Sequence, residues 1–191
     1  MLWLKIAFKP KAKIAATSFA GQYKTLRLAI ACTAEYTTYF GGVSQALAAI
    51  NATLTRVNGI FNRDLSLHLN LIANTTAIIY TNPATDPFSP ANSGVNGAWN
   101  LELQRDLTTK IGNANYDIGH LFGASGGGGN AGCIGCVCQN PLSSNDVAKG
   151  GGFSSPANNK PEGDTFDIDF VAHEIGHQLG ANHTFSHEVE G

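Results

Sequence analysis

Charged residues are scarce in this sequence: Asp, Glu, Lys and Arg together make up 14% of its 191 residues, and the formal net charge is −2. A chain with so little basic charge offers no electrostatic footprint for nucleic acid or for an anionic membrane surface, and we expect neither partner. Nor does any stretch approach the ~20 consecutive apolar residues of a membrane-spanning helix. Because 43% of the residues are hydrophobic, disorder is not expected either, and the length suits one folded domain.

A recognisable signal peptide is also lacking. The first ten residues are apolar but are interrupted by Lys5 and Lys9, whereas the apolar core of a signal peptide runs for ~7–15 residues. We interpret residues 1–24 as an N-terminal extension or the remnant of a propeptide, and residues 25–191 as the folded domain.

Hydrophobic periodicity predicts alternating strands and helices along the chain. Apolar residues recur every three or four positions over residues 43–61 and about every four over residues 99–111, which is the spacing of an amphipathic helix. They alternate with other residues over 23–33 and 65–72, and an apolar stretch at 116–122 follows as a further strand. This order favours an α/β (α+β) fold in which helices pack on a twisted, mostly parallel sheet.

The most informative stretch is residues 173–183, His-Glu-Ile-Gly-His-Gln-Leu-Gly-Ala-Asn-His. On a helix, His173 and His177 lie one turn apart on the same face, so both imidazoles can reach one ion. Glu174, beside the first histidine, can reach a water held by that ion. Gly180 allows the chain to turn sharply out of the helix and to bring back His183 as a third nitrogen ligand. Three imidazoles and one open position are typical of a catalytic zinc site.

These eleven residues match HExxHxxGxxH, the zinc-binding signature of the metzincin metalloendopeptidases, and residues 166–185 around them resemble the reprolysin-like (adamalysin, M12B-like) branch. The resemblance implies a zincin-like catalytic domain with an antiparallel edge strand on its sheet and a zinc-binding active-site helix. It also implies a zinc-dependent endopeptidase in which His173, His177 and His183 bind one Zn²⁺ and Glu174 acts as general base. Its substrates would be proteins or peptides, and its location would be secreted or at the cell surface.

In the reprolysin-like proteases, the segment that residues 116–122 resemble is the edge strand bordering the cleft. An edge strand leaves backbone donors and acceptors unpaired, so an extended peptide can dock there by strand addition. We therefore expect Gly119, His120, Leu121 and Phe122 to bind the substrate backbone. His120 is interpreted as a strand side chain, because the metal site already has three ligands.

Metzincins take their name from a methionine in a turn beneath the zinc, downstream of the third histidine. The only methionine here is Met1, and the sequence ends at Gly191, eight positions after His183. We therefore expect the sequence to be a piece of a longer precursor that lacks the C-terminal subdomain, with most of the wall of the primary specificity pocket. This leaves open whether the piece itself is active.

Three of the four cysteines lie in a glycine-rich connection, residues 123–152, which contains no phosphate-binding GxxxxGKS pattern. Cys133, Cys136 and Cys138 form a CxxCxC cluster, whereas closed zinc sites usually combine two separate CxxC-like halves. Cys32, in an apolar strand, is a poor fourth ligand. Disulfides are therefore favoured over a second metal site, and their pairing stays open.

Two other ligand sets are weaker than the histidine motif. Asp164, Asp167 and Asp169 could bind calcium, but they do not form an EF-hand pattern, and capping of the following helix explains them more simply. His187 could replace His183 as the third ligand, but the glycine turn favours His183.

Two alternative functions compete with proteolysis. A non-proteolytic metal-binding or adhesion module would keep the metal helix without turnover, although such a module has no use for Glu174. An inactive precursor would place a cysteine on the fourth position of the metal, but residues 1–24 contain no cysteine.

Overall fold

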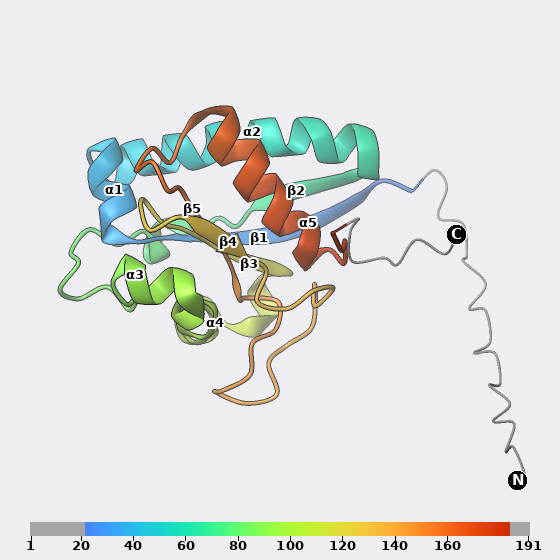
Figure 1. The fold of residues 1–191 in the computed structure, drawn as a ribbon. Helices are drawn as coiled ribbons and strands as arrows, with labels where there is room; N and C mark the ends of the chain where they lie inside the picture. Colours follow the sequence, from blue (N-terminus) through green and yellow to red (C-terminus); the bar gives the residue numbers. More distant parts are fainter. Residues whose placement is uncertain (1–21, 184–191) are drawn as a thin grey trace, which may run out of the picture.

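The structure, a computed structural model, describes residues 22–183 (Figure 1). In this part of the chain a five-stranded sheet has the order β2-β1-β3-β5-β4. The strands are β1 (Lys24–Cys32), β2 (Leu67–Leu71), β3 (Ile118–Phe122), β4 (Gly128–Asn130) and β5 (Gly152–Ser155). The first four strands in this order are parallel to one another, and β4 runs antiparallel to β5. The fold is therefore the expected mixed α/β fold, with a mostly parallel sheet and an antiparallel edge strand.

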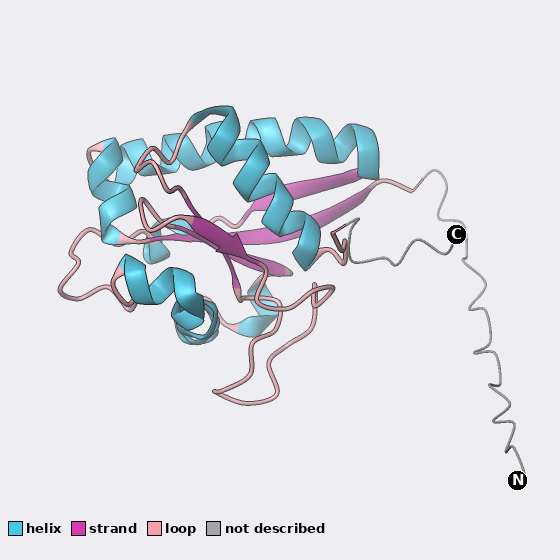
Figure 2. Cartoon of the chain, in the orientation of Figure 1, coloured by secondary structure: helices cyan, strands magenta, loops and turns pink. Residues whose placement is uncertain are grey.

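Helices cover both faces of the sheet (Figures 1 and 2). They are α1 (Ala34–Phe40), α2 (Val43–Leu65), α3 (Ala91–Ser93), α4 (Trp99–Lys110) and α5 (His173–Gln178), with the π-helical segment η4 (Thr165–Ala172) leading directly into α5. Residues of α1, α2, η4 and α5 share one hydrophobic core, and residues of α4 belong to the other. The sheet is therefore the middle one of three layers, with a helical layer and a hydrophobic core on each of its faces.

Strand β1 supplies both cores, because successive side chains of a strand point to opposite faces. Leu28 and Ile30 lie in the core under α2, whereas Ala29 and Ala31 lie in the core under α4. The helices contribute the apolar residues whose spacing predicted them: Ile50, Leu54, Val57 and Phe61 from α2, and Trp99, Leu103 and Leu107 from α4. The helices expected over 43–61 and 99–111 are thus confirmed, and α2 continues for one more turn.

One expectation from the sequence is wrong: Gly119–Phe122 does not lie at the edge of the sheet. These residues form most of β3, which pairs with β1 on one side and β5 on the other and is fully buried. Its backbone groups are used within the sheet, so they are not free to bind an added peptide strand. The strands at the two ends of the sheet are β2 and β4, and β4, a three-residue strand inside the glycine-rich connection, is the end strand that lies beside the metal helix.

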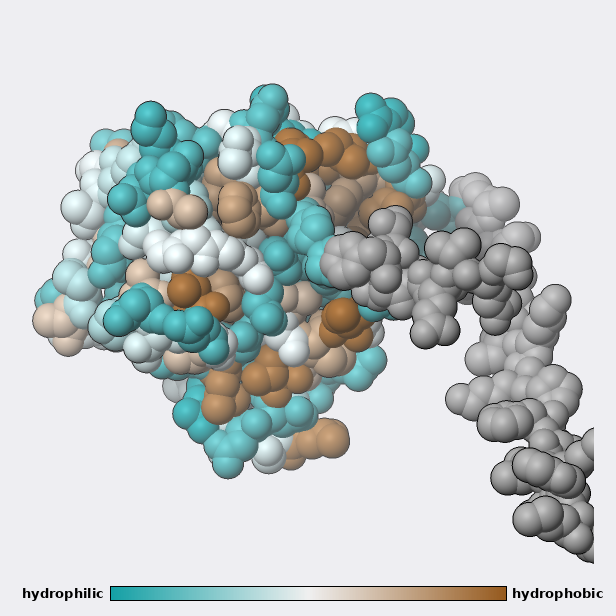
Figure 3. Space-filling view, in the orientation of Figure 1, coloured by the Kyte–Doolittle hydropathy of each residue, from teal (hydrophilic) through white to brown (hydrophobic). Residues whose placement is uncertain are grey.

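The surface mixes polar residues with small, separate apolar patches on the face shown in Figure 3. Among the described residues, none of the helices is both long enough and apolar enough to cross a membrane. The extension expected over residues 1–24 lies outside the described part except for its last three residues, and so does His187.

Candidate metal centre

The helix that carries the metal motif presents one apolar and one polar face. Phe166, Val171 and Ile175 are buried in the core that η4 and α5 share with α2. The histidines lie away from this core, as the spacing predicted.

Two of the three aspartates considered for calcium already pair with a basic side chain. Arg56 of α2 forms ion pairs with Asp164 and, at 3.1 Å, with Asp167.

The imidazoles of His173, His177 and His183 converge on one point. The Nε2 atom of His177 lies 3.0 Å from Nε2 of His173 and 3.1 Å from Nε2 of His183, and the remaining pair is also 3.1 Å apart. In the described part of the chain this is the one group of three or more His, Cys, Asp or Glu residues that could hold a metal ion. Nitrogen ligands ~2.0 Å from a tetrahedral zinc ion stand roughly 3.3 Å from one another. The triangle of nitrogens therefore fits such an ion.

Hydrogen bonds around the helix end orient this triangle. The Nδ1 atom of His177 lies 2.7 Å from the carbonyl oxygen of Ala181 and donates to it, which leaves Nε2 with a free lone pair for a metal. Gly180, at φ 112°, adopts the left-handed conformation that ends the helix. Its N–H donates to the carbonyl of His177, and the N–H of Ala181 donates to that of Gly176. The turn predicted at Gly180 is confirmed, and it brings His183 back beside the other two rings.

The lowered tendency of His173 to take up a proton also favours metal binding. Its pKa is lowered, mainly by burial and then by repulsion from His177 and His183. A neutral imidazole is the form that binds a metal.

Glu174 lies beside the triangle and is buried against the edge strand. A Cβ atom added to Gly129 of β4 would lie 2.4 Å from Cγ of Glu174 and 2.6 Å from its Oε1, so only glycine permits this approach. Burial raises the pKa of the Glu174 carboxyl, and the neighbouring charge of His177 partly opposes that rise. A carboxylate in this setting is a stronger base than one in water.

A cavity of about 400 Å³ lies between the helix and the edge strand. The three histidines, Glu174 and Asn182 line one side of it. The other side is lined by β4 and the segment that follows it, through Gly129, Asn130, Ala131, Gly132 and Ile134. The cavity therefore joins the candidate metal site to the open edge of the sheet.

His120 takes part in a buried network that the sequence did not reveal. Its Nδ1 lies 2.8 Å from Oε1 of Gln178, and its Nε2 lies 2.9 Å from Oγ of Ser154. The side-chain amide of Gln178 also donates to the carbonyl of Gly119 at 2.9 Å. Burial lowers the pKa of His120 to about 4, partly opposed by the bond to Gln178. His120 is therefore a structural side chain that, through Gln178, joins α5 to β3 and β5.

Two of the four cysteines form a disulfide. Cys133 is bonded to Cys136, whereas Cys32 is buried and free and Cys138 is exposed and free.

Gly129 and Gln178 are the site residues that sequence reasoning missed. The clue to Gly129 was the run of four glycines that it ends, Gly126–Gly129, whereas Gln178 had only its position next to His177.

Comparison with known proteins agrees with the motif. The sequence profile of a family described as metallo-peptidase family M12B, reprolysin-like, matches residues 22–191. The chain matches no curated protein significantly.

Proposed function

Because the chain belongs to the reprolysin-like family of M12B metallopeptidases, we propose that it hydrolyses peptide bonds as a zinc-dependent endopeptidase. The observation that carries this proposal is the triangle of imidazole nitrogens, 3.0–3.1 Å apart, with Glu174 lining the same cavity. Three nitrogen ligands with a fourth position open to the cavity are the arrangement of catalytic rather than structural zinc.

The roles of the residues follow from their positions. His173, His177 and His183 would hold the ion through Nε2. Zinc bound there would lower the pKa of a coordinated water to about 7 and would polarise the carbonyl of the bond to be cut. Glu174 accepts the proton of the attacking water and returns it to the departing amine. Its burial strengthens it as a base, and the contact with Gly129 holds it beside the cavity.

The edge strand β4 is the better candidate for substrate binding than β3. Among the described strands β4 pairs only with β5, so its outer edge can accept an extended peptide. Antiparallel pairing is the more stable mode. A peptide added antiparallel to Gly128–Asn130 would have its C-terminal part beside Gly128 and its N-terminal part toward Ile134. Its backbone would then cross the cavity in front of the histidines.

The disulfide supports a proposal about location. Disulfides persist in oxidising surroundings outside the cytoplasm. The Cys133–Cys136 bond therefore favours the secreted or cell-surface location that the family implies.

The test compares the wild-type chain with Glu174→Gln, both loaded with zinc. We expect the variant to retain one zinc ion per chain but to cut a peptide library at least ~1,000-fold more slowly, because the base is lost while the ligands stay. Equal rates for the two proteins would contradict the role of Glu174. If both chains bind zinc and neither cuts any peptide, the non-proteolytic metal-binding module becomes the better description.

A further inference from the structure

A large apolar side chain lies exposed beside the metal triad. Ile134 is 54% exposed, and of the exposed large hydrophobic residues in the described part of the chain it is the one that lines the metal cavity. The rest of the lining is glycine, alanine, asparagine and the site residues themselves. Ile134 is therefore the apolar surface that this cavity offers to a ligand.

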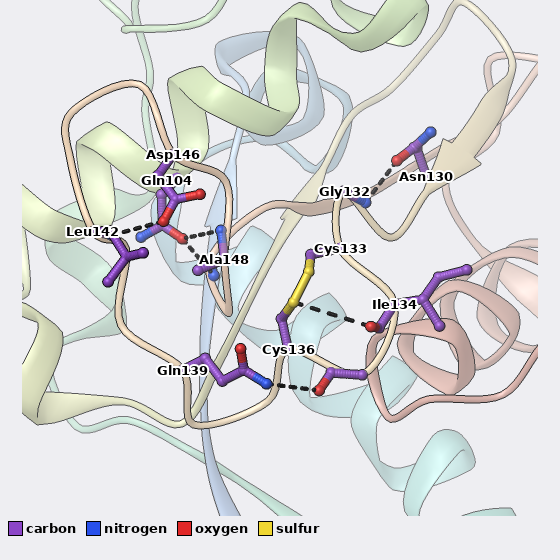
Figure 4. Close-up of a disulfide and its surroundings, with 12 residues drawn as sticks. Gln104, Asn130, Gly132, Cys133, Ile134, Cys136, Gln139, Leu142, Asp146 and Ala148 are labelled. Carbon is purple, nitrogen blue, oxygen red and sulfur yellow. Dashed lines mark hydrogen bonds between the residues drawn. A yellow bond between two sulfur atoms is a disulfide. The ribbon is translucent and has the colours of Figure 1, made fainter. Parts of the chain in front are cut away.

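Ile134 is held in place by covalent and hydrogen bonds. It lies between Cys133 and Cys136, whose disulfide closes the turn, and its side chain points away from that bond (Figure 4). Next to it, the N–H of Gly135 donates to the carbonyl of His177 at 3.2 Å. A Cβ atom on Gly135 would lie 3.6 Å from the Cα of Gly180, so the turn is packed on the end of α5. The position of Ile134 relative to the histidines is thus built into the fold.

We infer that Ile134 determines specificity by selecting an apolar side chain on the N-terminal side of the bond to be cut. This inference rests on the proposed function and on antiparallel addition of the peptide to β4. In that orientation the residues before the scissile bond lie toward Ala131 and Ile134. An apolar side chain there removes the exposed surface of Ile134 from water, whereas a polar one must give up its own hydration for an apolar neighbour.

Two peptide hydroxamates test the inference without requiring turnover. A C-terminal hydroxamate chelates zinc, so its peptide part occupies the N-terminal side of the cleft. We compare acetyl-Ala-Ala-Leu hydroxamate with acetyl-Ala-Ala-Asn hydroxamate, because Leu and Asn side chains have the same number of non-hydrogen atoms, branched at the same position. Binding to the zinc-loaded 191-residue chain is measured by calorimetry. We expect the leucine compound to bind roughly tenfold more tightly, the effect of burying one apolar contact of ~1.4 kcal/mol.

Three variants separate the contact from a general effect on folding. Ile134→Ser should reduce the preference to roughly twofold by weakening the leucine compound, with binding of the asparagine compound nearly unchanged. Ile134→Val, which keeps a branched apolar side chain, should retain most of the preference. Leu142→Ser is the matched control: Leu142 is 95% exposed in the same connecting segment and does not line the metal cavity, so the preference should stay at the wild-type value.

The outcomes are distinct for the two proposals. Equal affinities of the two compounds for the wild-type chain, or an unchanged preference in Ile134→Ser, would overturn the selection by Ile134. Zinc uptake without binding of either hydroxamate would overturn it too, since the peptide path would be wrong. A chain that takes up no zinc would instead show that the proposed function itself has failed.

Discussion

Gly129 of the edge strand and Glu174 of the metal helix are in such close contact that one additional carbon atom between them would overlap the carboxylate. The Cβ of an alanine at position 129 would lie 2.4 Å from Cγ of Glu174 and 2.7 Å from its Cδ. The strand that we propose binds the substrate, β4, thus also positions Glu174, the proposed general base. A displacement of β4 at Gly129 therefore displaces the side chain of Glu174, and the reverse also holds.

Gly129→Ala should therefore reduce hydrolysis without removing the metal. The added methyl group forces Glu174 or β4 to move, and small displacements of a catalytic group cost roughly 10²-fold in rate. Zinc content should stay at the wild-type level, because the three histidines are not touched. Steady-state rates on one peptide and zinc analysis of the same sample measure both effects.

Gly176→Ala is the control for that variant. Gly176 lies in α5 itself, and a Cβ added there meets no atom within 4 Å. Alanine in place of a helical glycine should raise stability by ~1 kcal/mol or less and leave the rate unchanged. Equal losses of activity in the two variants would show that the Gly129 effect is not the clash with Glu174.

Removal of the metal should abolish hydrolysis and lower the melting temperature. A ligand that binds only the folded chain stabilises it by about 2.7 kcal/mol at a concentration of 100 Kd, so a chelator removes that contribution. His177→Ala should have the same two effects permanently, and added zinc should restore the chelated wild-type chain but not the variant. His68→Ala, in β2 and outside the triad, should keep the zinc-dependent stabilisation of the wild-type chain. Zinc-dependent stabilisation that persists in His177→Ala would contradict the assigned ligand.

His120 should make stability fall as the solution becomes acidic. Burial lowers its pKa to about 4, whereas in the unfolded chain the value is ~6.5. Below pH ~6.5 the unfolded state therefore binds a proton that the folded state excludes, and stability falls until the pH reaches the folded pKa. Between pH 7 and pH 5 the loss from this residue is ~2 kcal/mol at 1.36 kcal/mol per unit.

Urea unfolding of wild type and His120→Gln at pH 7 and pH 5 isolates this contribution. The other titrating groups are common to both proteins, so the difference between their pH dependences belongs to His120. The variant should be less stable at pH 7, because it disturbs the bonds to Gln178 and Ser154, yet it should lose less on acidification. The same loss in both proteins would mean that His120 is not the buried neutral group.

The Cys133–Cys136 bond should stabilise the domain modestly. It closes a short loop, for which the chain-entropy model gives ~2 kcal/mol. The double substitution Cys133→Ser/Cys136→Ser should lower the free energy of unfolding by about this amount, whereas Cys138→Ser, at the exposed free thiol, should leave it unchanged. Unfolding curves with and without a reducing agent give the comparison, and reduction should affect only the chains that contain both Cys133 and Cys136.

Local patterns predicted most of the elements and the clustering of the three histidines. The apolar spacing in α2 and α4 depends only on neighbouring turns of one helix, and the same holds for the pair His173 and His177. The return of His183 depends on a single glycine in the left-handed conformation. Interactions of this kind join residues no more than ten positions apart, so they can be predicted from the sequence.

Sequence alone therefore determined the family, the cluster of three imidazoles that could hold a metal ion and the neighbouring carboxylate of Glu174. The tertiary structure decided which strand borders the cavity, because strand order depends on pairing between segments far apart in the chain. β4 consists of two glycines and an asparagine, so it has no hydrophobic alternation to predict it, and the buried apolar strand β3 was mistaken for the edge. The contacts of Glu174 with Gly129 and of Gly135 with the end of α5 likewise exist only after the sheet and the helix have packed together.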